Sequence, residues 1–218
     1  LFLALALFGL IIVSSDLYLL NDFPLGAALR EGIFITISGI TCTGLQNSDI
    51  IFWTAPPAIL IIILMFIGGV AGSTAGGIKV NRLVLVYDTL VWWFKRFFVG
   101  RRVIVPFRHE GRTLPRDISE LELSKNLLIV TLWIIVLFVG VMILLQLYAT
   151  PFAPHQVLFE AASAMSNVGL SDGYMTYASP LPAKWVFIML MWIGRLEIVP
   201  IIVLVIGLTR GFEPTVAR

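Results

Sequence analysis

Long apolar runs that alternate with two short, uncharged polar turns constrain most strongly how this chain can fold. The apolar runs lie at about 1–20, 51–71, 83–94, 126–149 and 185–208. The turns read T-C-T-G-L-Q-N-S-D from Thr41 and S-N-V-G-L-S-D-G from Ser166. A helix needs about 20 residues to cross the hydrocarbon core of a bilayer, and the first, fourth and fifth runs are long enough. The sequence therefore predicts a membrane protein built from helices.

Composition supports the bilayer as the solvent of this chain. Of its 218 residues, 59% are hydrophobic and 13% are charged, whereas a soluble domain carries about a quarter charged residues. The net charge of +2 suggests no nucleic-acid partner. Leu1 stands inside an apolar run with no basic segment before it, which we interpret as a piece of a longer protein and not a signal peptide.

Two segments, 25–40 and 152–165, are too short to span a membrane and run directly into the polar turns. Prolines stand at or near their starts, where proline is well tolerated in a helix. A short helix that ends in a polar turn at membrane depth is typical of a re-entrant hairpin, because irregular backbone there must line a cavity or be buried in protein.

The two halves of the chain can be aligned with one another. F-I-T-I-S-G-I-T-C-T-G-L from Phe34 matches F-E-A-A-S-A-M-S-N-V-G-L from Phe159, and M-F-I-G-G from Met65 matches M-W-I-G-R from Met191. Such self-similarity indicates repeated architecture. We predict an all-α membrane protein with two helix–re-entrant pore loop–helix repeats. The first repeat, 1–100, comprises an outer helix 1–20, a pore helix and filter 25–48 and a broken inner helix 51–98. A cytoplasmic link 101–122 precedes the second repeat, 123–218, with an outer helix 123–149, a pore helix and filter 152–173 and an inner helix 183–209.

The basic residues predict the orientation. Ten of the fifteen lysines and arginines lie between Lys79 and Lys125, which places this region in the cytoplasm by the positive-inside rule. Both glycine turns then face outward. The basic link is either a solvated loop that obeys the topology rule or a docking surface for a cytoplasmic partner.

The polar turns have the chemistry of a site for an alkali cation. Glycine can take backbone angles closed to other residues, so that successive carbonyl oxygens point to one axis and replace the water around an ion. The negative end of the preceding helix favours a cation there. The alternative is that both glycines simply link helices. The candidate filter residues are Thr41, Cys42, Thr43, Gly44, Ser166, Asn167, Val168 and Gly169.

Other polar residues near the turns give weaker signals. Cys42 is better explained as a small filler than as a reactive thiol. His155 and Glu160 lack the further ligands of a metal site, and Glu160 is better explained as a pore-facing or hydrogen-bonded side chain.

A glycine-rich run, G-G-V-A-G-S-T-A-G-G from Gly68, interrupts the first inner helix, and Arg195 stands at the matching point of the second. The glycines either unwind the helix or allow close helix packing. The spacing to Lys79 fits a phosphate-binding loop poorly. An arginine inside an apolar run needs partners, which makes Arg195 either a gate element or a structural tether. The candidate gate residues are Gly72, Ser73, Thr74, Ala75, Gly76, Gly77, Lys79, Arg195 and Glu197.

Taken together, T-C-T-G-L, the glycine-rich run, S-N-V-G-L-S-D-G and G-R-L-E resemble the Trk/Ktr/HKT superfamily of potassium transporters, in particular the Trk-type membrane subunit. The resemblance covers nearly the whole chain. It implies four repeats around one pore, of which this chain supplies the third and fourth. It also implies that Gly44 and Gly169 are filter glycines and that a gating loop, 72–77, faces Arg195. The resemblance further implies a homodimer in the cell membrane and a cytoplasmic ring of nucleotide-binding regulatory subunits.

We therefore predict potassium uptake through a channel-like pore, with no catalytic residues and no cofactor other than the transported ion. The alternatives are a sodium-selective or sodium-coupled member of the same superfamily, or a structural membrane protein that transports nothing. A membrane enzyme lacks support because no nucleophile–base pair or metal cluster is visible in the sequence.

Overall fold

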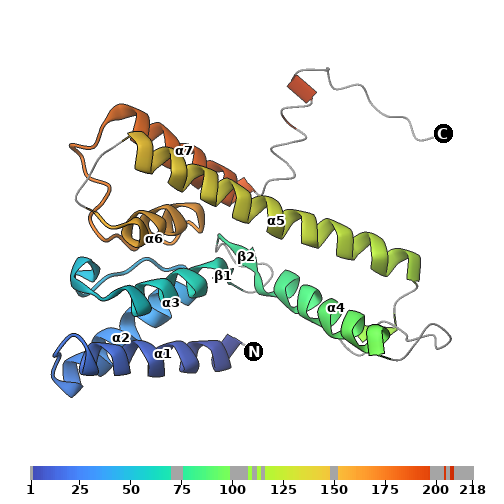
Figure 1. The fold of residues 1–218 in the computed structure, drawn as a ribbon, viewed down its shortest axis with the longest axis horizontal. Helices are drawn as coiled ribbons and strands as arrows, with labels where there is room; N and C mark the ends of the chain where they lie inside the picture. Colours follow the sequence, from blue (N-terminus) through green and yellow to red (C-terminus); the bar gives the residue numbers. More distant parts are fainter. Residues whose placement is uncertain are drawn as a thin grey trace.

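The computed structural model describes residues 2–69, 76–98, 108–109, 112–113, 116–147, 152–196, 204 and 207–208. Its helices follow the apolar runs and the two shorter segments (Figure 1). They are α1 (Phe2–Leu19), α2 (Leu25–Ile40), α3 (Ala55–Phe66), α4 (Val80–Phe98), α5 (Arg116–Leu147), α6 (Pro154–Met165) and α7 (Leu181–Leu196), with a 3-10 helix, η1, at Ile50–Phe52. Residues 101–107, 110–111 and 114–115 of the predicted link, 101–122, lie outside the described residues, and α5 already begins within that link at Arg116. Residues 197–203, 205–206 and 209 of the predicted inner helix, 183–209, also lie outside the described residues.

Proline and glutamine determine where the two short helices begin. Pro24 precedes α2, and its carbonyl oxygen accepts hydrogen bonds from the first turn of that helix. Pro154 is the first residue of α6, a position where the missing N–H would have no helical partner. The Gln156 side chain accepts a bond of 2.8 Å from the backbone N–H of Ala153 and so caps the same end. Both starts are thus defined by local chemistry.

Helix α3 ends at Phe66, and α4 begins only at Val80. Between them, β1 (Ile67–Gly68) pairs in parallel with β2 (Ile78–Lys79). The end of α3 and the start of α4 therefore lie next to each other, although 13 residues separate the two helices. Residues 70–75 lie outside the described residues. The predicted interruption of the inner helix falls in this interval.

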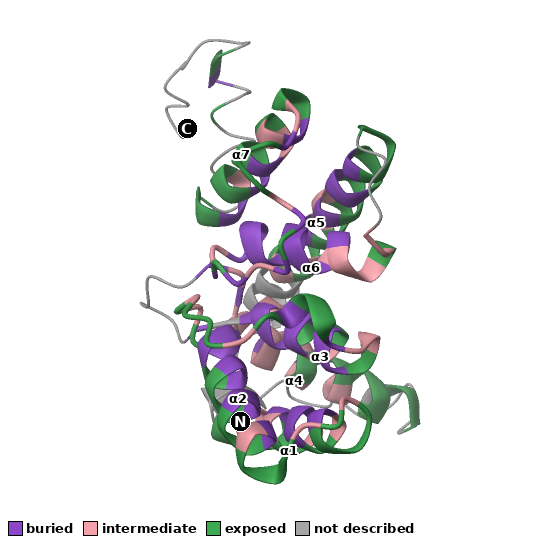
Figure 2. Ribbon diagram, turned by 90° about the vertical axis from the view of Figure 1, so that its left-hand side faces the viewer, coloured by how far each residue is buried: buried purple, intermediate pink, exposed green. Residues whose placement is uncertain are grey.

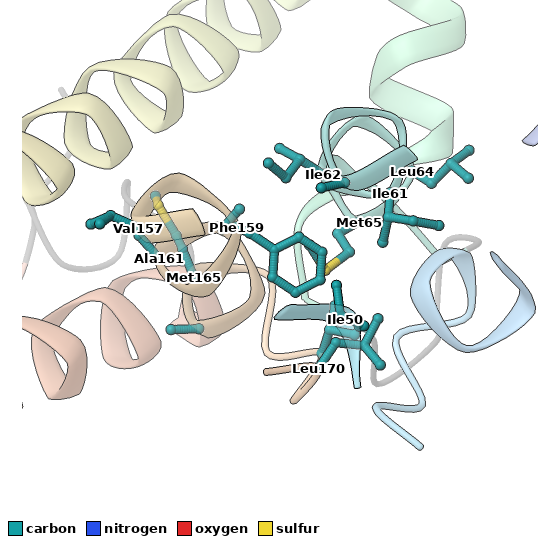
Figure 3. Packing of buried hydrophobic residues seen from close by; sticks show 14 of the residues in the cluster. Ile50, Ile61, Ile62, Leu64, Met65, Val157, Phe159, Ala161, Met165 and Leu170 are labelled. Atoms are coloured by element: carbon teal, nitrogen blue, oxygen red, sulfur yellow. The ribbon is translucent and has the colours of Figure 1, made fainter. Parts of the chain in front are cut away.

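The helices form two groups that meet at α3 and α6. Helices α1, α2 and α3 pack against one another, α5, α6 and α7 form the second group, and α3 contacts α6 between them (Figure 1). Figure 2 shows buried residues concentrated on α2, α3 and α6. The shared core combines residues of both groups (Figure 3), among them Ile50, Ile61, Ile62, Leu64, Met65, Val157, Phe159, Ala161, Met165 and Leu170. The two turns that follow α2 and α6 are therefore held by one apolar core.

Apolar side chains also cover much of the outside. Leu3 is 76% exposed on α1 and Phe138 is 56% exposed on α5. Within the described residues, one helical segment is long and apolar enough to cross a membrane: Ser124–Leu147, 24 residues with a mean hydropathy of 3.1. Leu3–Leu19 and Ala55–Phe66 are shorter apolar helices. Exposed apolar surface of this extent is expected where helices face lipid or another protein.

Candidate functional site

Helices α2 and α6 end in turns of the same backbone conformation. The capping residue has φ −85° and ψ −4° at Thr41, and φ −80° and ψ −3° at Ser166. The next residue is left-handed in both turns, with φ 53° at Cys42 and φ 53° at Asn167. This conformation costs a residue with a side chain roughly 1–2 kcal/mol. Contacts around both turns must therefore stabilise it.

Two backbone hydrogen bonds close each turn in the same way. The N–H of Thr43 donates to the carbonyl of Ser38 at 3.0 Å, and that of Val168 donates to Ser163 at 2.9 Å. The preceding left-handed residue donates to the carbonyl three positions before it, at 3.2 Å in the first turn and 3.1 Å in the second. This pair of bonds is the Schellman motif of helix ends. The two helices thus stop by the same device.

Sequence reasoning assigned the special backbone of these turns to their glycines and missed Cys42 and Asn167. The left-handed position of a Schellman motif is usually glycine and sometimes asparagine, so Asn167 carried a detectable signal and Cys42 carried none. Asn167 is also tied to α7, because its side-chain Nδ2 donates to the carbonyl of Met191 at 3.3 Å. These residues define the backbone that leads into each glycine.

Gly44 and Gly169 also have positive φ, 73° and 102°. A Cβ added at Gly44 would overlap the carbonyl oxygen of Val168, so the first turn lies directly against the second. A Cβ added at Gly169 would lie 3.7 Å from the Cα of Gly44, an ordinary contact. Gly44 is therefore required by close approach and by conformation, whereas Gly169 is required by conformation alone.

Matching serines on the two short helices bond to the chain beyond each turn. The hydroxyl of Ser38 donates to the carbonyl of Leu45 at 2.7 Å. The hydroxyl of Ser163 accepts the N–H of Gly169 at 3.1 Å. Each helix thereby holds the residue at or next to its glycine, and the backbone of the turn cannot reorient without losing a hydrogen bond.

The structure brings the candidate filter residues together but exposes them unequally. The N–H of Ser171 donates to the side-chain Oε1 of Gln46 at 3.1 Å, a direct bond between the two turn regions. Exposed residues are Thr41, Thr43 and Gly169, intermediate ones are Cys42, Gly44 and Asn167, and buried ones are Ser166 and Val168. The first turn is thus more open than the second.

The described end of the glycine-rich run lies against the second turn. A Cβ added at Gly76 would overlap the carbonyl oxygen of Ser166. Gly77 has φ 73°, and Lys79 lies opposite Gly68 in the β1–β2 pair. The other candidate gate residues from this run, together with one from the second half, lie outside the described residues: Gly72, Ser73, Thr74, Ala75 and Glu197.

Arg195 lies in the last turn of α7 and is exposed. Its neighbour Gly194 packs on the end of α6, because a Cβ added there would overlap the carbonyl oxygen of Met165. Gly76 contacts the next residue of the same turn, Ser166. The end of the glycine-rich run and the helix turn that carries Arg195 therefore both lie against the end of α6 and the second turn.

Glu160 is buried on α6 and is hydrogen-bonded to the segment that follows the second turn. Its carboxylate accepts bonds from the hydroxyl of Ser171 at 2.9 and 3.0 Å and from the N–H of Asp172 at 3.0 Å. Asp172 lies outside the helices and is buried as well. Within the described residues, no group of three or more histidine, cysteine, aspartate or glutamate side chains could hold a metal ion.

Comparisons with known proteins agree on one family. A family model described as TrkH, cation transport protein, matches residues 2–210. The uncharacterized cation transporter MJ1485 of Methanocaldococcus jannaschii is 28% identical over 194 residues, which cover 89% of this chain and 40% of that protein. The Trk system potassium uptake protein TrkH of Halomonas elongata is 27% identical over 212 residues, covering 93% of this chain and 41% of that one.

A solved structure has the same fold. The crystal structure of the potassium transporter TrkH from Vibrio parahaemolyticus superposes with a TM-score of 0.74 at 25% sequence identity. The match covers 100% of this chain and 44% of that one. This chain therefore spans about two fifths of the length of the relatives that it matches.

Proposed function

The chain belongs to the TrkH family of cation transport proteins, and on that premise we propose that it forms half of a pore through which potassium enters the cell. Curated relatives are named as potassium uptake proteins. The family is described as one of cation transport proteins, and the chain is not an enzyme.

The observation that carries the proposal is the pair of matching turns that lie against each other. Both end short helices by the same motif, and both reach a glycine with positive φ, Gly44 and Gly169. Carbonyl oxygens held in such a backbone can replace the hydration shell of a potassium ion. The C-terminal ends of α2 and α6 add partial negative charge beside them. The proposed filter comprises Thr41, Cys42, Thr43, Gly44, Ser166, Asn167, Val168 and Gly169.

We assign the two groups of helices to two pore repeats, 1–100 and 123–218. In the first, the order is α1, α2, turn, α3 and α4, with α3 and α4 as the two parts of the broken inner helix, 51–98; in the second, it is α5, α6, turn and α7. The basic link faces the cytoplasm, and the turns face outward. Two further repeats complete the pore around a central axis.

The gate in this proposal combines the glycine-rich run with Arg195. Gly76 and Gly194 contact adjacent residues of the second turn, so a loop and a positive charge at this place would stand below the filter. A positive charge in a cation pathway is an electrostatic barrier. Movement of the loop away from Arg195 opens the path.

The partners in this proposal are the lipid bilayer, a second copy of the protein, and a cytoplasmic ring of nucleotide-binding subunits that controls opening. The basic link offers the contact surface for that ring. A sodium-selective or sodium-coupled pore is the second candidate function. The ion selectivity of the pore depends on all four filter turns, and this chain supplies two of them.

The test is uptake of potassium by a transport-deficient host that carries the full-length protein. Serine at Gly44 or at Gly169 should impair potassium-limited growth or admit sodium, because positive φ strains a residue with a side chain. Gly26→Ser is the matched control, since an added Cβ at Gly26 meets nothing within 4 Å. Unchanged uptake and selectivity in both turn variants would contradict the filter assignment.

A second measurement tests the gate. Arg195→Ala should raise potassium flux when the regulatory ring is absent, because the barrier loses its charge. A variant with the same low basal flux as the wild type would show that Arg195 only tethers helices.

A further inference from the structure

Two buried carboxylic acids lie side by side behind the second turn. Glu160 on α6 is 8% exposed, and Asp172, which follows the turn, is 4% exposed. The backbone N–H of Asp172 donates to the Glu160 carboxylate at 3.0 Å, so the two acidic residues are in direct contact. Two buried like charges in contact repel strongly, so such a pair holds a proton on one member.

The hydrogen bonds around the pair show where that proton is needed. Asp172 Oδ1 accepts the N–H of Tyr174 at 3.2 Å. Asp172 Oδ2 is buried and, within the described part of the chain, has no hydrogen-bond donor. A buried acceptor without a donor is expensive. A proton on Glu160, directed at Asp172 Oδ2, supplies the missing donor.

Few other charges act on the pair. His155, on α6 itself, exerts a coulombic effect on Asp172. Helices α3, α5 and α7 pack against α6. Helix α3 has no charged residue. Helix α7 carries two, Lys184 and, in its last turn, Arg195. The Nζ of Lys184 donates to the carbonyl of Tyr177. Among the described side chains of α5, Lys125 is the charged one.

Both members of the pair act on the backbone next to Gly169. Glu160 and Ser163 stand three residues apart on α6 and so share one helix face. Ser163 bonds to the N–H of Gly169, and Glu160 bonds to Ser171 and to the N–H of Asp172. One face of α6 thereby holds the chain from the turn glycine to Asp172.

We propose that Glu160 is protonated and donates its proton to Asp172, and that this pair is a positioning device that keeps the second filter turn in its conducting shape. The inference rests on the proposed function, because it concerns how that filter is held. The position in the first half that corresponds to Glu160 is Ile35, and the one that corresponds to Asp172 is Asn47. The device therefore belongs to the second turn alone.

The proposal predicts that transport through the pore is impaired when the pH rises, and not when it falls. The proton on Glu160 is retained at low pH and is lost as the pH rises. Two adjacent carboxylates then repel one another, and the segment 170–174 moves away from α6. Potassium uptake and the preference for potassium over sodium should both fall at alkaline pH.

The experiment uses the full-length protein in proteoliposomes, with potassium and sodium fluxes measured from neutral to alkaline pH. Glu160→Gln should keep wild-type flux and selectivity at neutral pH, because its amide can donate to Asp172 and still accept from Ser171. Its profile should stay flat at alkaline pH, since an amide loses no proton there. Glu160→Ala should reduce selectivity about tenfold at neutral pH, because Asp172 Oδ2 loses its donor. Asp49→Asn, at an exposed carboxylate after the first turn, is the matched control and should follow the wild-type profile.

Two results would overturn the proposal: a Glu160→Gln profile that falls with pH as the wild type does, or a Glu160→Ala variant with wild-type selectivity. Infrared difference spectra of the purified proteins provide a readout independent of transport. The wild type should show a protonated-carboxyl band that Glu160→Gln lacks. If the wild type carries no potassium, the pore assignment fails, while the presence or absence of that band still decides whether Glu160 holds the proton.

Discussion

Alanine at three helical glycines should destabilise the protein in a graded order that depends on what each added methyl group meets. At Gly26 in α2 it meets nothing within 4 Å, and at Gly140 in α5 it meets Leu190 side-chain atoms at 2.9 and 3.1 Å. At Gly194 in α7 it would overlap the backbone carbonyl of Met165. All three glycines stand inside helices, so the backbone conformation is the same in each case. Differences in stability between the three variants therefore report the packing around the added methyl group.

The magnitudes follow from these neighbours. Gly26→Ala should stabilise the protein by up to about 1 kcal/mol, because alanine loses less backbone freedom on folding. Gly140→Ala has the same gain but crowds a flexible leucine, and overpacking costs about 1–3 kcal/mol, so the net destabilisation should be about 0–2 kcal/mol. At Gly194 a rigid carbonyl cannot rotate away. The cost should reach about 3 kcal/mol or more, as α7 moves off the end of α6.

The assay is thermal unfolding of the purified full-length protein in detergent, followed by potassium uptake of the same variants in cells. We expect melting temperatures in the order Gly26→Ala, Gly140→Ala, Gly194→Ala, with the last clearly below the wild type. Gly194→Ala should also alter basal potassium flux, because it displaces the neighbouring Arg195. A Gly194→Ala protein as stable as the Gly26→Ala protein would refute the close contact between α7 and the second turn.

Ser163→Ala should lower potassium selectivity, measured by competition with sodium, because the N–H of Gly169 loses its 3.1 Å acceptor. A hydrogen bond of this kind contributes about 0.5–1.5 kcal/mol, and unchanged selectivity would contradict the role of Ser163. Tyr174→Phe should lower the unfolding free energy by about 0.5–1.5 kcal/mol, since the hydroxyl donates to the carbonyl of Leu144 at 3.3 Å, and an unaltered melting temperature would count against that bond.

Much of the fold could be predicted from the sequence, because its signals are local. Apolar runs and prolines indicated where the described helices lie, and the aligned motifs pointed to two turns of one design. The family assignment was confirmed by the comparisons. The hydrogen-bonded alternative for Glu160 agrees with the bonds that it accepts from Ser171 and Asp172.

Other features of the site could not be predicted from residue types. Cys42 takes a left-handed conformation that glycine usually occupies, and no local pattern marks it. The contact between Gly44 and Val168 joins residues that are far apart in the chain. The carboxyl pair also escaped sequence reasoning, because neither Glu160 nor Asp172 is unusual until each is buried beside the other.

Hydrophobicity and helix-stopping chemistry are properties of contiguous residues, and for that reason the sequence by itself determined the apolar segments, the ends of the short helices and the family. The tertiary structure alone decided which turn lies against which, how closely backbones approach, and which buried acid faces another. These features depend on atoms brought together from distant parts of the chain. The space that one segment leaves determines how large a side chain the other segment can carry at the contact, and in some places only glycine fits.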